Sequence, residues 1–293
     1  FSGSRIDRTR EISWDGRDED GRVREGSYTA RYTVLYDKGN RPEAESREFE
    51  IDVSGPRAGV DVGPLPFSPD NDGVNDELQI SLNVSDESSI AQWQFDILDR
   101  NRRSFISFSG DREPAETLVW DGRSSDGELV ISAEDYPYEF TITDALGNTT
   151  TRSGEIPVGI LVVRDGERLK VRISNINFQP NSPELELDLD TELGQKNRQV
   201  LQRLVQVFDK YDTYQIRIEG HAVNITGTER EEREELQPLS LARAQTVKDA
   251  LVEEGMDPGR ITVLGRGGTE PIVPHTDLEN RWKNRRVEFI LIR

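Results

Sequence analysis

Hydrophobic and polar residues alternate over much of the first 158 residues, which is the period of a strand with one buried face. The alternating segments are Tyr28 to Tyr36, Leu78 to Val84, Ala91 to Leu98, Phe105 to Phe108 and Tyr136 to Ile142. Asp-Gly and Gly-Asn pairs between them supply the positive φ angles of tight turns. Short strands separated by such turns predict antiparallel β-sandwich units rather than a βαβ fold.

One motif occurs twice in this β-rich part. Trp14 to Arg17 (Trp-Asp-Gly-Arg), followed by Asp20-Gly21, recurs as Trp120 to Arg123, followed by Asp126-Gly127. Each copy leads into an alternating aromatic segment that ends at an Asp and a Gly-Asn turn. The two tryptophans could serve a carbohydrate platform, but their matching positions favour a packing role in two related units.

The period of the pattern changes after Gly159. Two segments, 190–211 and 239–254, place apolar residues at helical spacing, and Gly255 follows the second where a left-handed cap is expected. The remaining apolar runs predict strands at 160–163, 169–173, 214–218, 261–264 and 287–292. This order predicts an α+β domain, with helices packed on one side of a mixed sheet.

These patterns divide the chain into three parts. Residues 1–56 form a partial or truncated β unit, 57–158 a complete β-sandwich, and 159–293 the α+β domain. The fold class is therefore a multidomain chain of all-β sandwich units followed by an α+β domain.

The charge and composition exclude several classes of binding partner and of chemical site. The formal net charge of −19 disfavours nucleic acid and anionic lipid surfaces. The absence of cysteine excludes disulfides and thiolate sites. No run approaches the ~20 apolar residues that span a bilayer, so we expect no transmembrane segment. Phe1 is not an initiator Met, and a signal peptide or lipid anchor is expected, if at all, upstream of it.

The motifs of the last 130 residues resemble, in order, those of the OmpA-like, peptidoglycan-associating domains. Ile216 to His221 is followed by Leu239-Ser240 with Arg243-Ala244, and later by glycines, Pro271 and Asn284 to Glu288. Phe178 to Ser182 takes the place of the family's first strand and its loop. The β units resemble Ig-like domains of the flagellar-hook-cap and gliding-motility C-terminal type.

The resemblance implies a groove for the diaminopimelate side chain of peptidoglycan. In the family an Asp of the Gly-His-Thr-Asp motif holds the ligand's ammonium, and the Arg of the Leu-Ser-x-x-Arg-Ala motif holds a carboxylate. Arg243 supplies that cation, but Val223 stands in the Asp position and offers no acceptor. An ammonium left unpaired there costs about 1–3 kcal/mol, so we expect peptidoglycan binding to be weakened or lost.

Two substitute acceptors remain open. Asn224 follows Val223 directly, and the inserted run Glu229 to Glu235 either folds over the groove or forms a solvated loop. The altered pocket implied by the resemblance comprises Asn181, Val223, Asn224, Ser240, Arg243 and Arg286, with Arg286 mainly structural.

Other candidate chemistry is weaker. Asp70, Asp72 and Asp76 around Gly73 are read either as a structural turn or as a calcium loop. His221 and His275 lack companions for zinc or for a catalytic triad. We therefore expect no metal site, no cofactor and no enzymatic activity.

The sequence leads to one favoured hypothesis. It is a non-catalytic structural or interaction protein of the bacterial periplasm and cell envelope, with other envelope proteins as partners. The alternative is a functional peptidoglycan anchor that uses Arg243 with a substitute acceptor.

Overall fold

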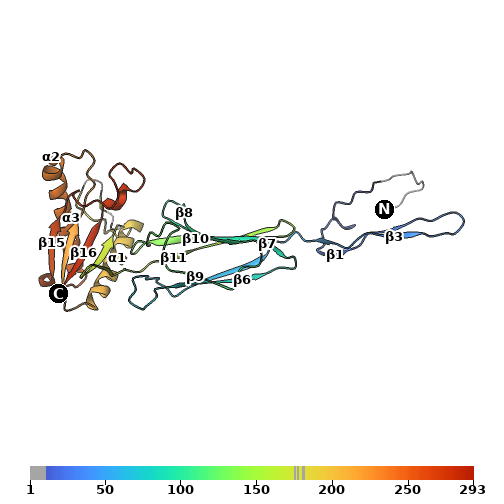
Figure 1. Cartoon of the computed structure of the whole chain (residues 1–293), viewed down its shortest axis with the longest axis horizontal. Coiled ribbons are helices and arrows are strands. Elements are labelled where there is room, and N and C mark those ends of the chain that lie inside the picture. The colour runs from blue at the N-terminus through green and yellow to red at the C-terminus, as the bar shows by residue number, and fades with distance from the viewer. Residues whose placement is uncertain (1–10, 175, 177, 180–181) are drawn as a thin grey trace.

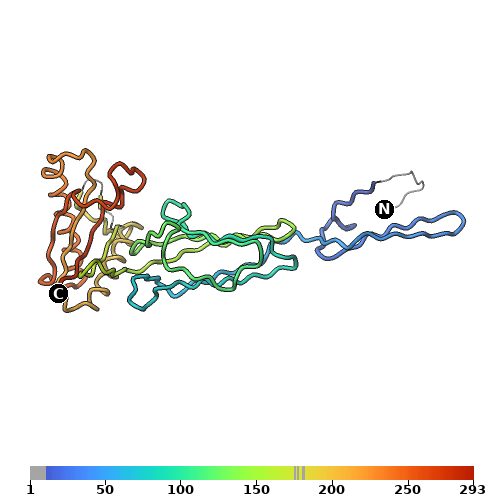
Figure 2. Tube along the Cα trace, in the orientation of Figure 1, coloured from blue at the N-terminus to red at the C-terminus, as the bar shows by residue number. Residues whose placement is uncertain are grey.

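The computed structural model describes residues 11–174, 176, 178–179 and 182–293. The molecule is elongated, with its N-terminal strands at one end, a β-sandwich in the middle and the helix-containing domain at the other end (Figures 1 and 2). No helix of the described residues is long and apolar enough to cross a membrane.

The N-terminal part consists of two short antiparallel strand pairs. β1 (Gly26–Tyr28) pairs with β4 (Phe49–Ile51), and β2 (Arg31–Thr33) pairs with β3 (Glu43–Glu45). Trp14 packs edge-on against Tyr28 and Phe49 at ring-centroid distances of 5.9 and 6.3 Å. Trp14 remains 43% exposed, so this aromatic cluster lies at the surface.

Two antiparallel sheets form the middle part. One has the order β5-β6-β9 and the other the order β11-β10-β7-β8. Their bounds are β5 Arg57–Gly63, β6 Leu78–Ser85, β7 Ile90–Leu98, β8 Ser104–Gly110, β9 Thr117–Trp120, β10 Asp135–Asp144 and β11 Thr149–Pro157. Alternate residues of β10 are buried, as its sequence pattern predicts. Phe67, Phe95, Trp120 and Phe140 fill the core that both sheets share.

The C-terminal part is an α+β domain, as predicted. Its five-stranded sheet has the order β12-β13-β16-β14-β15, and only the β14–β15 pair is parallel. The strands are β12 Val163–Asp165, β13 Arg168–Ile173, β14 Gln215–Gly220, β15 Ile261–Gly265 and β16 Val287–Ile292. The main helices are α1 Glu192–Asp209 and α3 Gln237–Glu253. Shorter helical segments are α2 Glu229–Glu231, the π-helix η1 Glu232–Leu236, and the 3-10 turns η2 Pro258–Arg260 and η3 Arg281–Asn284.

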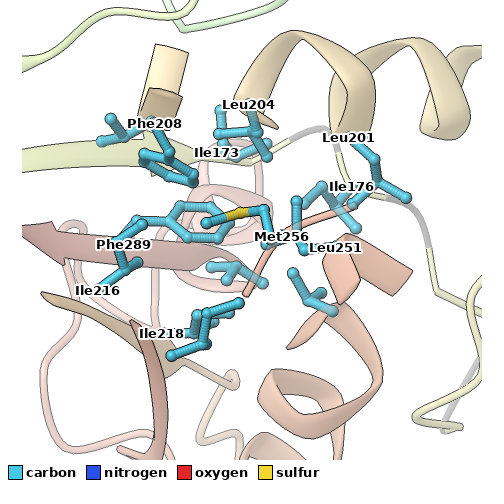
Figure 3. Close-up of a cluster of buried hydrophobic side chains, with 14 of the residues drawn as sticks. Ile173, Ile176, Leu201, Leu204, Phe208, Ile216, Ile218, Leu251, Met256 and Phe289 are labelled. Atoms are coloured by element: carbon cyan, nitrogen blue, oxygen red, sulfur yellow. The ribbon is translucent and has the colours of Figure 1, made fainter. Parts of the chain in front are cut away.

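Both long helices pack on one face of this sheet (Figure 3). Leu201, Leu204 and Phe208 of α1 meet Phe289 of β16, and Leu251 of α3 joins the same buried cluster. The Phe208 and Phe289 rings lie 5.3 Å apart. Thr191 caps α1, because its side chain accepts a hydrogen bond from the Gly194 N–H.

The first strand of this domain begins later than the sequence predicts. The sequence predicts a strand over residues 160–163, but β12 begins at Val163. Ile160 is buried in the core of the α+β domain, whereas the next residue, Leu161, is buried in the sandwich core. Because these two adjacent residues are buried in different hydrophobic cores, they connect the two domains. They are not part of a β-strand.

Side chains also bridge the two domains. Arg103 forms an ion pair with Glu279 at 2.8 Å, and Lys283 pairs with Glu128. The Arg100 guanidinium lies over the Trp282 ring, 4.3 Å from its centroid. The turn between β7 and β8 is thereby held against the segment that precedes β16.

Candidate functional site

A cleft of about 970 Å³ opens where the α+β domain meets the sandwich. Its walls come from the segments after β13 and β14, from α2, η1 and the start of α3, from the segment before β16 and from the β7–β8 turn. Among the residues that line it are His221, Ala222, Val223, Leu236, Leu239, Arg243, Trp282, Arg285, Arg286, Arg100 and Asn101.

Glycines allow the strands beside this cleft to approach α3. A Cβ at Gly220 would lie 2.1 Å from the Ser240 carbonyl oxygen, and one at Gly265 would lie 2.8 Å from that of Gln237. Only residues without a side chain fit such contacts. The close crossing places the residues after β14 directly beside the first turns of α3.

Arg243 projects from α3 and lines the cleft. It is 8% exposed, and its Nε donates to the Ser182 carbonyl at 3.1 Å. Its guanidinium carbon lies 5.0 Å from the centroid of the Phe178 ring. Burial, with repulsion from Arg285, lowers the pKa of Arg243 from its ordinary value. No carboxylate of the described residues forms an ion pair with it.

The residue at the expected Asp position is an apolar Val in the same cleft. Val223 is half-buried and lines the cleft beside Ala222, whose N–H donates to the Gly267 carbonyl at 2.7 Å. Neither side chain can accept a hydrogen bond from an ammonium group.

Two other residues of the predicted pocket have local roles. The Asn224 Oδ1 accepts from the Gly227 N–H at 2.7 Å, which closes its own turn. The buried Ser240 hydroxyl donates to the Gln237 carbonyl and accepts from the Gly267 N–H at 2.9 Å. Neither lines the cleft, and Asn181 lies outside the described residues.

Arg286 belongs to a buried ion network beneath the cleft. Its Nε donates to Glu288 at 2.7 Å, and one Nη donates to the Glu270 carbonyl. Lys170 and Arg172 reach the same Glu288 carboxylate at 3.0 Å each. Burial alone would raise the pKa of Glu288. The attraction of the neighbouring cations, Arg286 and Lys170 among them, is stronger and lowers this pKa to about 2.

His221 lies beside this network and is 2% exposed. Burial, together with repulsion from Arg286, lowers the pKa of His221 to about 4. The imidazole is therefore neutral at pH 7 and adds no charge to the cleft.

The inserted acidic run is mostly exposed, as a solvated loop would be, but it is helical. Thr228 caps α2 by accepting from the Glu231 N–H, and η1 then continues directly into α3. Glu232 accepts from the Gly268 N–H at 2.9 Å, which ties the run to the segment after β15. Glu231 and Glu235 line the cleft. The Glu231 carboxylate is already engaged by Thr226.

The aspartate loop of the sandwich forms a closed turn. Asp76 accepts from the N–H groups of Asn71 and Gly73, and Asp70 accepts from that of Val162 at 2.9 Å. The carboxylates of Asp70, Asp72 and Asp76 lie within 4.8 Å of one another. The Asp70 Oδ1 is buried and has no hydrogen-bond partner among the described residues. The turn and the domain junction therefore explain most of the contacts of this loop, and the calcium alternative stays a prediction.

Arg100, Asn101 and Trp282 were not among the predicted pocket residues. Arg100 and Asn101 belong to the sandwich, more than a hundred residues from Val223 in the chain. Only the docking of the two domains brings them to the cleft, and no spacing in the sequence signals that contact.

Comparison with known families identifies the α+β domain. Residues 177–285 match the OmpA family. This segment is an OmpA family domain. The resemblance inferred from the motifs around His221 and Arg243, which lie within this range, is thereby confirmed.

Individual relatives agree with this assignment. Outer membrane protein A of Bordetella avium is 36% identical over 100 residues, which are 34% of this chain and 49% of that protein. The probable lipoprotein YiaD of Escherichia coli K12 is 27% identical over 134 residues, or 45% and 55% of the two chains. Motility protein B of Helicobacter pylori J99 is 43% identical over 51 residues, or 17% and 20%. This chain thus spans from a fifth to little more than half of the length of these relatives.

A solved structure is similar to part of this chain. The putative MotB-like protein from Desulfovibrio vulgaris is 29% identical to this chain, with a TM-score of 0.37. The match covers 45% of this chain and 76% of that protein.

Proposed function

We propose that this chain is a non-catalytic structural or interaction protein of the bacterial cell envelope, located in the periplasm. The OmpA family domain supports this role, as do relatives named as an outer membrane protein, a lipoprotein and a motility protein. Such a role requires binding surfaces and domains held at a fixed distance, but no catalytic activity.

The β-rich parts act in this proposal as Ig-like spacers. The boundaries are 1–56 for a partial unit, 57–158 for a complete unit and 159–293 for the OmpA family domain. The elongated arrangement in Figure 1 supports this division, because the two β parts extend away from the domain in one direction. Other envelope proteins are the proposed partners of these units.

The OmpA family domain has, in this proposal, an altered ligand pocket with weakened or lost peptidoglycan affinity. The observation behind it is the pair of Arg243 and Val223 in one cleft. An ammonium group brought to Val223 loses its water and gains no acceptor, at a cost of about 1–3 kcal/mol. That cost corresponds to roughly tenfold to a hundredfold in the dissociation constant.

One observation favours a second candidate, a functional peptidoglycan anchor. Glu235 lines the same cleft as Arg243, on the π-helix that precedes α3. Its carboxylate is a substitute acceptor for an ammonium group. In this version Glu235 replaces the missing Asp, and zwitterionic ligands bind.

Pelleting with purified sacculi separates the two candidates. We expect the native chain to remain in the supernatant and Val223→Asp to pellet, because that change restores the missing carboxylate opposite Arg243. Leu146→Asp is the matched control, since it adds the same charge at an exposed turn of the sandwich. Pelleting of the native chain, lost in both Arg243→Ala and Glu235→Gln, would establish the anchor instead.

A further inference from the structure

The cleft is rich in cations although the chain as a whole is strongly acidic. Five arginines and two glutamates line it, in a protein of net charge −19. Arg286 forms an ion pair with Glu288, and Arg100 lies 4.0 Å from Glu134. The other three, Arg243, Arg281 and Arg285, have no ion pair with any carboxylate in the part of the chain that the structure describes.

Buried polar atoms beside these arginines have no hydrogen-bond partner among the described residues. They are one Nη of Arg286, which is 6% exposed, and both ring nitrogens of His221. Both residues line the cleft. An unsatisfied guanidinium donor is costly, whereas an anion in the cleft would accept from it and from the single N–H of the neutral His221 imidazole.

Part of the lining is apolar. Val223, Leu236 and Leu239 line the cleft, together with the more exposed Leu278 and with polar residues such as Ser174 and Gln179. An apolar wall buries the aliphatic part of a ligand and strengthens the attraction between a guanidinium and an acid group, because it excludes water. The site therefore suits a short carbon chain with acidic ends.

We propose that this cleft binds an aliphatic dicarboxylate that carries no ammonium group, and that Arg100 of the sandwich forms part of the site. Arg243 and Arg285, which both line the cleft and have no carboxylate partner among the described residues, hold one carboxylate between them. Arg100, stacked on Trp282, is in the wall on the sandwich side, where the second carboxylate binds. The proposal rests on the loss of the ammonium site proposed above, and it adds a ligand class and a second domain to the site.

Three small molecules with related carbon chains test the ligand class: pimelate, cadaverine and diaminopimelate. Pimelate has the carbon chain of diaminopimelate without its two ammonium groups, and cadaverine has the diamine chain without the two carboxylates. Titration calorimetry of the full chain should show binding of pimelate and none of cadaverine. Diaminopimelate should bind at least tenfold more weakly than pimelate, because its ammonium groups find no acceptor.

Variants test the residues. Arg243→Gln should abolish pimelate binding, and Arg100→Gln should weaken it about tenfold, the loss of one charge-assisted contact. Arg102→Gln is the matched control: it lies on the same turn, pairs with Glu139 and does not line the cleft. Circular dichroism of each variant checks that the fold is retained.

The outcomes separate this inference from the proposed function. Absence of pimelate binding, with native chain still free of sacculi, overturns the dicarboxylate site and leaves the proposed function standing. Diaminopimelate binding as tight as that of pimelate overturns both, because an ammonium acceptor must then exist. Equal affinities of Arg100→Gln and Arg102→Gln would confine the site to the OmpA family domain and overturn the part assigned to the sandwich.

Discussion

The two copies of the Trp-Asp-Gly-Arg turn have the same hydrogen bonds in very different surroundings. In each copy the indole N–H donates to the carbonyl of the arginine three residues later, at 2.6 Å for Trp14 and 2.8 Å for Trp120. The arginine N–H donates to the Asp carboxylate at 3.1 Å in both copies. The guanidinium reaches a Gly carbonyl at 2.8 and 3.0 Å. These bonds are local, so a few residues suffice to form them.

Burial separates the two copies. Trp120 is 1% exposed, because aromatic rings from three other segments pack on it: Phe67, Phe105 and Tyr136. Trp14 is 43% exposed and contacts two rings of its own small sheet region. The comparison teaches that a turn motif determines its own geometry, whereas a core around it requires two facing sheets.

The largest expected difference between the copies concerns the tryptophans themselves. Trp120→Ala should destabilise the sandwich by about 3–5 kcal/mol, the usual cost of removing a large buried aromatic side chain. Trp14→Ala should cost about 1 kcal/mol, since it removes two exposed edge-to-face contacts. Hydrogen exchange of the β10 amides and of the β1 amides in the full chain measures each effect locally. Similar losses in both copies would show that the N-terminal unit has a core of its own.

The same distinction explains how much of the fold the sequence predicts. Local patterns predict α3, β10 and the repeated turn, because the periodicity and turn residues that form them lie within each segment. The residues 160–163 are different: Ile160 and Leu161 read as a strand, yet each is buried in a different domain. Their structure depends on how the domains dock, which no local pattern contains.

The candidate site shows the same limit. Arg243 is predictable, because the Leu-Ser-x-x-Arg-Ala motif fixes its place on α3. Arg100 is not, because it comes to the cleft from a turn of the sandwich. The conformation of the acidic run 229–235 was also not predictable from its charge. Seven consecutive charged residues suggest a loop, but the Thr228 cap and the hydrogen bond from the Gly268 N–H to Glu232 stabilise a helix.

Two glycine variants should give a smaller difference in stability between the two copies of the turn. Gly16 and Gly122 have φ angles of +80° and +79° in their turns. A Cβ at Gly16 meets no atom within 4 Å, whereas one at Gly122 would lie 2.5 Å from Pro69 and 3.1 Å from the Phe67 ring. Gly16→Ala should therefore lower the free energy of unfolding of its turn by about 1–2 kcal/mol, from backbone strain alone.

Gly122→Ala should cost about 1–3 kcal/mol beyond that strain, because the methyl group overpacks the sandwich core. Hydrogen exchange of the amides in each turn measures the two costs under one condition. The difference between the variants isolates the contribution of the core, since the backbone angles match. Equal costs would mean that Phe67 and Pro69 move aside freely and that the core over this turn is loosely packed.

The smallest expected effect is a difference in pH response between the turns. In the first copy the Asp18 carboxylate accepts from the N–H groups of Asp20 and Arg22, at 3.0 and 2.9 Å. In the second copy the Ser124 hydroxyl takes this place and accepts from the N–H groups of Asp126 and Glu128. The hydrogen bond from Arg24 lowers the pKa of Asp18 below its ordinary value of 3.8. The folded turn thus binds its proton less readily than the unfolded chain does.

It follows that the carboxylate stabilises the first turn above pH 3.8, and that this contribution is lost as the pH falls through the lower pKa of the folded turn. The serine turn has no such titration. The reciprocal exchange Asp18→Ser and Ser124→Asp should transfer the acid response from the Arg22 amide to the Glu128 amide, followed by NMR shifts between pH 7 and 3. An acid response that stayed at Arg22 after the exchange would show that Asp18 is not its source. In that case the two copies would differ in their surroundings alone, and the turn itself would be the same structure twice.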